Sequence, residues 1–253
     1  MKFRLIDILL FSLLFIFVVS FPVDMLGLPL MYQYILSIGL KVLLLTYYAY
    51  TFWRYRINIF KFANYRRALL FIPFLIACFS NLIATKVSGS NFVLFYDPTI
   101  LSLVIVSTVL TAINEEILFR YFIHNSLVFA SSIKRIFVSA LIFALFHLLS
   151  LVEVRSVVAL TTILVQFVYT FGLGLILGFM YEYTYSLPLC MVFHLCFNFF
   201  NQVLVTRIIA FDINDTYTLT FYLTAVVIAV VLAIYGSLIY LLIFKKNNRY
   251  FHE

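Results

Sequence analysis

The chain has 253 residues, of which 65% are hydrophobic and only 11% charged, and its formal net charge is +7. Its mean hydropathy of +1.12 excludes an ordinary soluble domain, because the apolar runs reach the roughly 20 residues that a helix needs to cross a bilayer. The basic residues are divided among short loops and form no continuous face, so nucleic acid is not an expected partner. No repeat, low-complexity tract or long linker divides the chain, which predicts a single transmembrane domain over residues 1–253.

The apolar runs predict an all-α, polytopic membrane bundle of about eight transmembrane helices. The expected spans are 5–21, 30–52, 68–86, 99–121, 135–152, 157–181, 186–206 and 219–244. The first run could be a signal peptide, but Asp7 interrupts it and no small-x-small cleavage site follows, so we interpret it as a membrane helix. Asp97 as N-cap and Pro98 in the first turn predict that the fourth span begins near Thr99.

The distribution of Lys and Arg predicts the orientation, because positively charged loops stay in the cytoplasm. With a cytoplasmic N-terminus, 13 of the 17 Lys and Arg residues fall on the cytoplasmic side: Lys2, Arg4, Arg54, Arg56, Lys61, Arg66, Arg67, Arg120, Lys134, Arg135, Lys245, Lys246 and Arg249. Lys86, Arg155 and Arg207 fall outside, and Lys41 lies within the second span, where we assign it no role. An even number of spans returns the C-terminus to the cytoplasm.

Two adjacent acids stand near the end of the fourth span, where buried carboxylates need a partner or a function. On a helix, Glu116 and Arg120 are i and i+4 and can form an ion pair, whereas Glu115 lies about 140° around the axis from Arg120. Glu115 is therefore the acid free to face a cavity and hold a water molecule. In the alternative interpretation, both acids lie in interfacial water at the end of the span.

Histidines occur in two later spans. His147 lies in the expected span 135–152 and His194 in the expected span 186–206. Asn198 and Asn201 lie on the same helical face as His194, and such a stripe of polar side chains requires polar neighbours or water inside the bundle. His124 and His252 lie near cytoplasmic ends and need no special role.

Two further patterns in the later spans have simpler explanations. Cys190 precedes His194 by four residues, so a cysteine nucleophile is an alternative, although a cysteine in an apolar helix is more typical of packing. Gly174 and Gly178 form a small-xxx-small face on which another helix can pack closely.

Three motifs in separate spans resemble one known family. Glu115-Glu116-x-x-x-Arg120, Phe143-x-x-x-His147 and His194-x-x-x-Asn198 are similar, in this order, to the motifs of the CAAX-protease and bacteriocin-processing (CPBP, or Abi) family of intramembrane proteases. Each motif alone is weak, since it specifies only two or three positions, but all three in order are a strong signal. The resemblance covers residues 97–206, the expected catalytic core.

The resemblance implies an intramembrane endopeptidase with a role for each motif residue. Glu115 would activate water with help from His147, while His194 and Asn198 would stabilise the oxyanion; Glu116, Arg120 and Phe143 would support them. No cofactor is favoured. The alternative is a zinc enzyme with Glu115, His147 and His194 as ligands, although no His-Glu-x-x-His spacing occurs.

The resemblance also implies a location and a class of substrate. It indicates a multi-pass protein of the bacterial cell membrane whose partners are the lipid bilayer and a membrane-associated peptide or protein. The peptide would be of CAAX type, a leader peptide or a signalling peptide, and family members also act in bacteriocin processing and immunity. The rival hypotheses are a non-catalytic immunity or scaffold protein and a proton-coupled transporter, but the chain has no matched broken halves.

Overall fold

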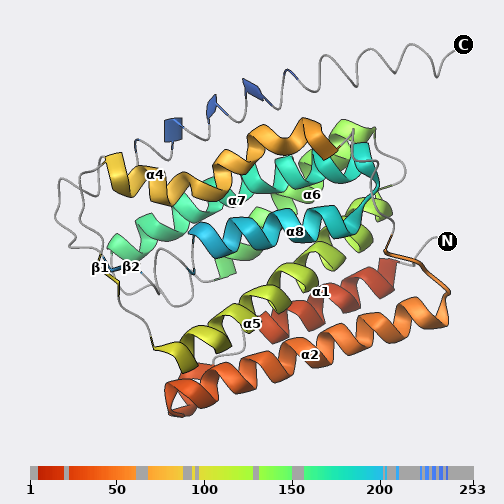
Figure 1. Cartoon of the computed structure of the whole chain (residues 1–253). Helices are drawn as coiled ribbons and strands as arrows, with labels where there is room; N and C mark the ends of the chain where they lie inside the picture. The colour runs from red at the N-terminus through yellow and green to blue at the C-terminus, as the bar shows by residue number, and fades with distance from the viewer. Residues whose placement is uncertain are drawn as a thin grey trace, which may run out of the picture.

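Long helices lying alongside one another form the molecule (Figure 1). The computed structural model describes residues 5–19, 23–60, 68–87, 93–94, 97–127, 131–149 and 157–201, with isolated positions beyond them. The longer helical elements are α1 (Leu5–Val19), α2 (Leu30–Arg54), η2 (Leu69–Phe79), α4 (Ser80–Val87), α5 (Pro98–Glu116), η3 (Ile117–His124), α6 (Ser132–His147), α7 (Val157–Thr184) and α8 (Leu187–Asn198). A short 3₁₀ turn η1 (Val23–Leu26) and a two-residue antiparallel pair, β1 (Val93–Leu94) with β2 (Ile209–Ala210), complete the described elements.

The all-α class expected from the sequence is confirmed for the described residues. Each of the first seven expected spans coincides with a helical segment, and η2 with α4 and α5 with η3 each form one continuous segment. The eighth expected span, 219–244, lies largely outside the described residues. Of the described helices, Leu30–Arg54 and Pro98–His124 are long and apolar enough to cross a membrane. The number of spans and the orientation remain predictions.

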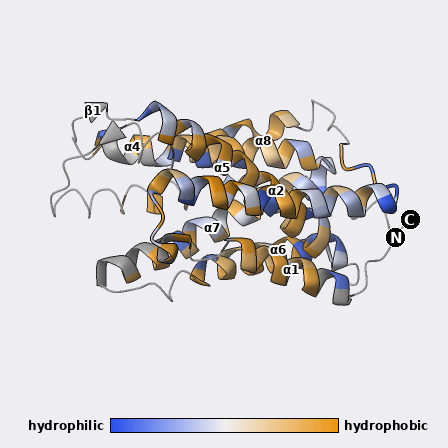
Figure 2. Cartoon of the chain, turned by 90° about the horizontal axis from the view of Figure 1, so that it is seen from below, coloured by the Kyte–Doolittle hydropathy of each residue, from blue (hydrophilic) through white to orange (hydrophobic). Residues whose placement is uncertain are grey.

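The outer faces of the helices expose large apolar side chains. Leu43 on α2 is 67% exposed and Trp53 near its end 76%, and α1 presents Leu13 and Phe17 in the same way. Figure 2 shows hydrophobic residues along much of α1, α5, α6 and α8, while the end of α2 is strongly hydrophilic. This pattern suits a lipid environment, where exposed apolar side chains do not contact water.

An aromatic cluster joins the first two helices to the segment that follows the acid pair. The Phe122 ring of η3 lies 4.2 Å from that of Phe11 on α1 and 5.7 Å from that of Phe52 on α2, measured between centroids. The fully buried Tyr48 packs beside them, 5.5 Å from Phe122. These contacts hold α1 and α2 against the end of α5 and so support the helix that carries Glu115 and Glu116.

The helix starts and the glycine face agree with the sequence interpretation. Asp97 caps α5 by accepting hydrogen bonds from the backbone N–H groups of Thr99 and Ile100, and Pro98 is the first helical residue, as expected. A Cβ atom added at Gly174 would stand 3.0 Å from the Ala140 Cα, and one at Gly178 would stand 3.0 Å from the Ile136 Cγ2. The close approach of α6 and α7 therefore requires these glycines.

The acid pair stands at a change of helix type. α5 ends at Glu116 and continues without a break as the π-helix η3. Wider turns of this kind re-aim the side chains beside them and occur frequently at functional sites. All but one of the eight residues of η3 are buried, so this local geometry is held by packing on every side.

Candidate functional site

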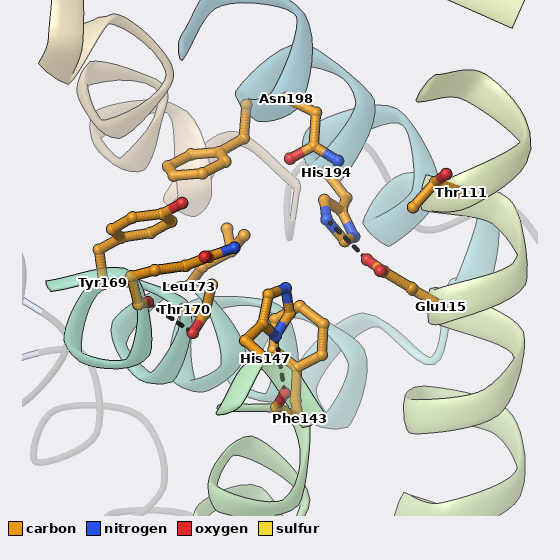
Figure 3. A pocket seen from close by; sticks show the side chains of 11 residues that line it. Thr111, Glu115, Phe143, His147, Tyr169, Thr170, Leu173, His194 and Asn198 are labelled. Carbon is orange, nitrogen blue, oxygen red and sulfur yellow. Dashed lines mark hydrogen bonds and ion pairs between the residues drawn. The ribbon is translucent and has the colours of Figure 1, made fainter. Parts of the chain in front are cut away.

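A cavity of about 170 Å³ lies between four helices of the bundle. α5 contributes Thr111 and Glu115 to its lining and α6 contributes Phe143 and His147. The remaining lining residues come from α7 and α8: Gln166, Tyr169, Thr170, Leu173, His194, Phe197 and Asn198. Figure 3 shows the side chains of Glu115, His147, His194 and Asn198 gathered around this space. The fold thus brings together the four motif residues that are expected to be catalytic.

The two glutamates face different surroundings, as the helical geometry predicts. Glu116 is fully buried, and its Oε2 accepts a hydrogen bond from the Nε of Arg120 at 3.2 Å. Glu115 lies in the wall of the cavity with 8% of its side chain exposed. The interpretation that both acids lie in interfacial water is wrong for Glu116, which solvent does not reach.

The His194 ring joins the two glutamates, a contact that the sequence did not indicate. Its Nδ1 lies 2.8 Å from Glu116 Oε1, and its Nε2 lies 3.4 Å from Glu115 Oε2. The two nitrogens of one imidazole thus face the two carboxylates, one in the packed interior and the other in the cavity wall.

The Arg120 side chain completes the support beneath His194. Besides Glu116, it bonds the Ser139 hydroxyl on α6 through Nη1 at 3.1 Å, and its guanidinium lies 5.5 Å from the centre of the Phe143 ring. Arg120 is 0% exposed. Arg120 thus lies inside the bundle and is paired with Glu116, as the four-residue spacing predicts, and its assignment to the cytoplasmic side stays a prediction.

The Phe143 ring contacts the arginine and both histidines. Its ring meets that of His147 edge to face at 5.0 Å and that of His194 at 5.8 Å. The His147 Nδ1 lies 3.0 Å from the Phe143 carbonyl oxygen, which orients the imidazole along the last turn of α6. Phe143 thus sets the positions of both rings on either side of the cavity.

The polar stripe on α8 divides between two places. Asn198 lines the cavity beside His194 (Figure 3), but Asn201 does not. Asn201 donates to the backbone oxygen of Ala77 at 2.8 Å and accepts from the Ser80 hydroxyl at 3.1 Å. Asn201 therefore has polar neighbours inside the bundle, as expected, but it lies beyond Asn198, where the helix continues as a π-helix, and its partners are on η2 and α4 rather than in the cavity.

Cys190 has a packing role. It is fully buried, it does not line the cavity, and its thiol lies 3.7 Å from the Leu177 carbonyl oxygen. The hypothesis of a cysteine nucleophile therefore has no support in the geometry.

The residues proposed as zinc ligands do not form a ligand cluster. Within the described part of the chain, no three His, Cys, Asp or Glu side chains are arranged so that they could hold a metal ion. Both His194 nitrogens are directed at glutamates, and the Nδ1 of His147 is directed at a backbone oxygen. The zinc hypothesis does not fit this arrangement, and we derive no step through a metal.

A second buried ionic cluster lies at the end of η3. The Nε2 of His124 is 2.7 Å from Glu182 Oε2 on α7, and Glu182 also accepts bonds from Ser132 and Arg135 at the start of α6. The expectation that His124 needs no special role is wrong, because its side chain is 98% buried and paired. His124 and Glu182 are 58 positions apart, and no sequence pattern relates them, so this cluster could be found only from the fold.

Comparison with known proteins gives a match to a family model. Residues 97–200 match the family model described as type II CAAX prenyl endopeptidase Rce1-like. No curated protein and no solved structure matches the chain. The matched segment begins at the N-cap of α5 and ends just beyond Asn198, so it contains every motif residue around the cavity.

Proposed function

We propose that this chain hydrolyses a peptide bond inside the membrane. The premise is that it belongs, through residues 97–200, to the Rce1-like type II CAAX prenyl endopeptidase family. The observation that carries the proposal is the cavity between α5, α6, α7 and α8, which joins one buried acid to two histidines and an amide. Such a set can activate water and stabilise an oxyanion in one low-dielectric space.

Glu115 is the proposed general base. A water molecule in the cavity would give a proton to the Glu115 carboxylate as its oxygen attacks the carbonyl carbon of the substrate. The C=O bond opens to a tetrahedral oxyanion, and the proton passes to the amide nitrogen as the C–N bond breaks. The His194 Nε2 at 3.4 Å from Glu115 supports proton movement at this point, and His147, across the cavity, would help to orient the water.

His194 and Asn198 are the proposed oxyanion donors, His194 through Nε2, which at 3.4 Å from Glu115 Oε2 lies beyond the ordinary length of a hydrogen bond to that carboxylate. They stand one helical turn apart on α8 and line the same side of the cavity (Figure 3). Glu116 is a positioning residue, because its carboxylate binds the Nδ1 of His194. Arg120 binds the other oxygen of Glu116, and Arg120 in turn donates to the Ser139 hydroxyl. Donors fixed in advance need no reorganisation when the negative charge develops.

The proposed substrate is a membrane-associated peptide with a CAAX-type C-terminus. The proposed location is a bacterial cell membrane, which the chain crosses several times. The cleft would open to the cytoplasmic side, because α5 starts at Asp97 on the side with few positive loops and carries Glu115 towards the other.

The function is tested by comparing peptides from membranes of cells that carry the natural chain or its Glu115→Gln variant. Mass spectrometry should find a C-terminally shortened protein and its released peptide only with the natural chain. Equal peptide patterns at equal protein abundance would contradict a proteolytic role.

The orientation gives a separate prediction. In a background in which Cys78, Cys190 and Cys196 are replaced by alanine, a single cysteine placed in the 54–67 loop or after Lys245 should react only with reagents on the cytoplasmic side. Cysteines at Ser88 and Asp212 should react from the outside. External labelling after Lys245 would show that the spans are miscounted, whereas external labelling of the 54–67 loop would reverse the side from which the cleft is entered.

A further inference from the structure

One wall of the cavity carries none of the three motifs. It is formed by α7, whose lining residues are spaced by three and four positions and so lie on one face of the helix: Gln166, Tyr169, Thr170 and Leu173. Figure 3 shows Tyr169, Thr170 and Leu173 across the space from Glu115. The residues proposed for the chemistry come from α5, α6 and α8, so a substrate that fills the cavity would also contact α7.

Gln166 brings to this wall a side-chain amide that has no hydrogen-bond partner within the described part of the chain. The Thr170 hydroxyl differs, because it donates to the backbone oxygens of Gln166 at 2.7 Å and Phe167 at 3.1 Å and so uses its proton within α7. The Gln166 side chain is half-buried. An amide without a partner is costly in an apolar bundle, whereas one that lines a cavity can bind a polar ligand that enters it.

The position of Gln166 along the cavity follows from the packing of α7 against α8. The two helices are joined by two residues and run antiparallel, and the ring centroids of Tyr169 and Phe197 lie 6.1 Å apart. Gln166 precedes Tyr169 by three residues and Asn198 follows Phe197 by one, so both steps lead in the same direction along the cavity. At about 1.5 Å of rise per residue, Gln166 stands roughly 3 Å beyond the level of Asn198 and about 9 Å beyond that of His194.

An extended peptide backbone has the chemistry that suits this amide. In a low-dielectric cavity, each peptide N–H and C=O group of the substrate needs a partner in place of water. A glutamine side chain can donate to a peptide carbonyl and accept from a peptide N–H. An extended chain advances about 3.3–3.6 Å per residue, so a substrate whose scissile carbonyl is held by His194 and Asn198 reaches Gln166 within about two residues.

From this arrangement we propose that Gln166 is a substrate-binding residue whose amide holds the peptide backbone within about two residues of the scissile bond. The inference rests on the proposed function. The contact is made to the backbone, so it does not depend on the side chains of the substrate. It therefore fixes the position of the chain against Glu115 and selects no particular sequence.

The test uses purified protein in proteoliposomes and one prenylated peptide with a CAAX-type end, whose point of cleavage is first determined from the products. Further versions of this peptide each have one backbone amide near the cut, other than the scissile one, replaced by an ester. An ester keeps the shape of the chain but has no N–H donor and a weaker carbonyl acceptor. With the natural chain, one of these esters should lower kcat/KM by about 3- to 10-fold, the range for one hydrogen bond.

Gln166→Met removes the amide and nearly keeps the length of the side chain. The KM for the parent peptide should rise by about 5- to 50-fold, the range for one or two lost hydrogen bonds. The kcat should stay nearly constant, because the contact is the same in the bound substrate and in the transition state. The ester that slows the natural chain should have no further effect on this variant, since its partner is gone.

Gln33→Met is the matched control, because Gln33 lies on α2 outside the cavity and its amide donates to the Leu28 carbonyl oxygen at 2.8 Å. It should change neither KM nor the response to the esters. Gln166→Asn keeps the amide but withdraws it by one methylene, so it should also raise KM and lose the ester response. It takes the place of Gln166→Met if that variant does not fold.

An unchanged KM in the folded Gln166 variant would overturn the inference, as would a lower kcat at constant KM or an ester response equal to that of the natural chain. A natural chain that is insensitive to every ester would also overturn it. Failure of both Gln166 variants to fold would make the amide structural, with the same consequence. If the natural chain does not cleave the parent peptide, this inference falls, and the peptide comparison with Glu115→Gln decides separately whether the chain is a protease.

Discussion

Replacing Glu115 by glutamine is expected to lower cleavage by about 10²–10⁴-fold, the usual contribution of a general base, while the protein stays inserted and abundant. Glutamine has the shape of glutamate and keeps a polar group towards His194, but it cannot take a proton from water. Because Glu115 lies in a cavity wall rather than in the packed interior, its replacement leaves no stranded partner of the kind that Arg120 would be. The measurement is single-turnover cleavage of a reporter peptide in proteoliposomes, with the amount of folded protein determined in parallel.

Glu116→Gln is the control, since it changes the neighbouring residue in the same way. This variant removes the negative charge between Arg120 and His194, both of which are buried. Breaking a buried pair costs about 3–5 kcal/mol, so we expect lower abundance and a lower unfolding temperature in detergent, together with some loss of activity through a less well held His194. If Glu115→Gln retained full activity, Glu115 would not be the base. If both variants were equally unstable, the assignment of Glu115 to the cavity wall and of Glu116 to the packed interior would be wrong.

Replacing Asn198 by alanine is expected to lower turnover by about 10²–10³-fold with little change in substrate binding. An oxyanion donor acts on the transition state, so its loss reduces kcat and leaves KM nearly constant. His194→Ala should show at least this loss, and it should also lower stability because it leaves both glutamates without their common partner. Asn201→Ala serves as the comparison, because Asn201 lies on the same helix but bonds to the Ala77 backbone away from the cavity. It should affect stability more than kcat.

The same enzyme preparation separates the glutamate mechanism from the zinc alternative. Strong chelators should leave the purified protein active, with no stoichiometric metal found by elemental analysis. Loss of activity that Zn²⁺ specifically restores would require a ligand arrangement different from the one described here. Asn198→Ala would not change bound metal in either case, so its kinetic effect is independent of that outcome.

Several features of the structure could be predicted from the sequence, because they depend on residues that are close together in the chain. Apolar runs of membrane length gave the helical ranges, and the cap at Asp97 gave the start of α5, because both depend on residues adjacent in sequence. The pairing of Glu116 with Arg120 followed from a four-residue spacing on one helix. The different surroundings of Glu115 and Glu116 followed from the same helical period.

Contacts between segments that are far apart in the sequence could not be predicted from it. The bond from Glu116 to His194 joins residues 78 positions apart, that from His124 to Glu182 joins residues 58 apart, and that from Lys41 to Ser107 joins residues 66 apart. No periodicity relates such positions, so only the packing of α2, α5, α6, α7 and α8 decides them. The bonds that join Asn201 to Ala77 and to Ser80 likewise span 124 and 121 positions.

By itself, the sequence determined that this chain forms apolar helices and carries three motifs that resemble those of a protease family, because hydropathy, capping and motif spacing act over a few residues. Only the tertiary structure decided that the motif residues share one cavity, that Glu116 holds His194, and that Gln166 lines the same cavity. Those relations depend on which helices pack together and on where along their lengths they are in contact. That choice is made by close packing at sites such as Gly174 against Ala140, and by the few buried polar groups that each require a partner.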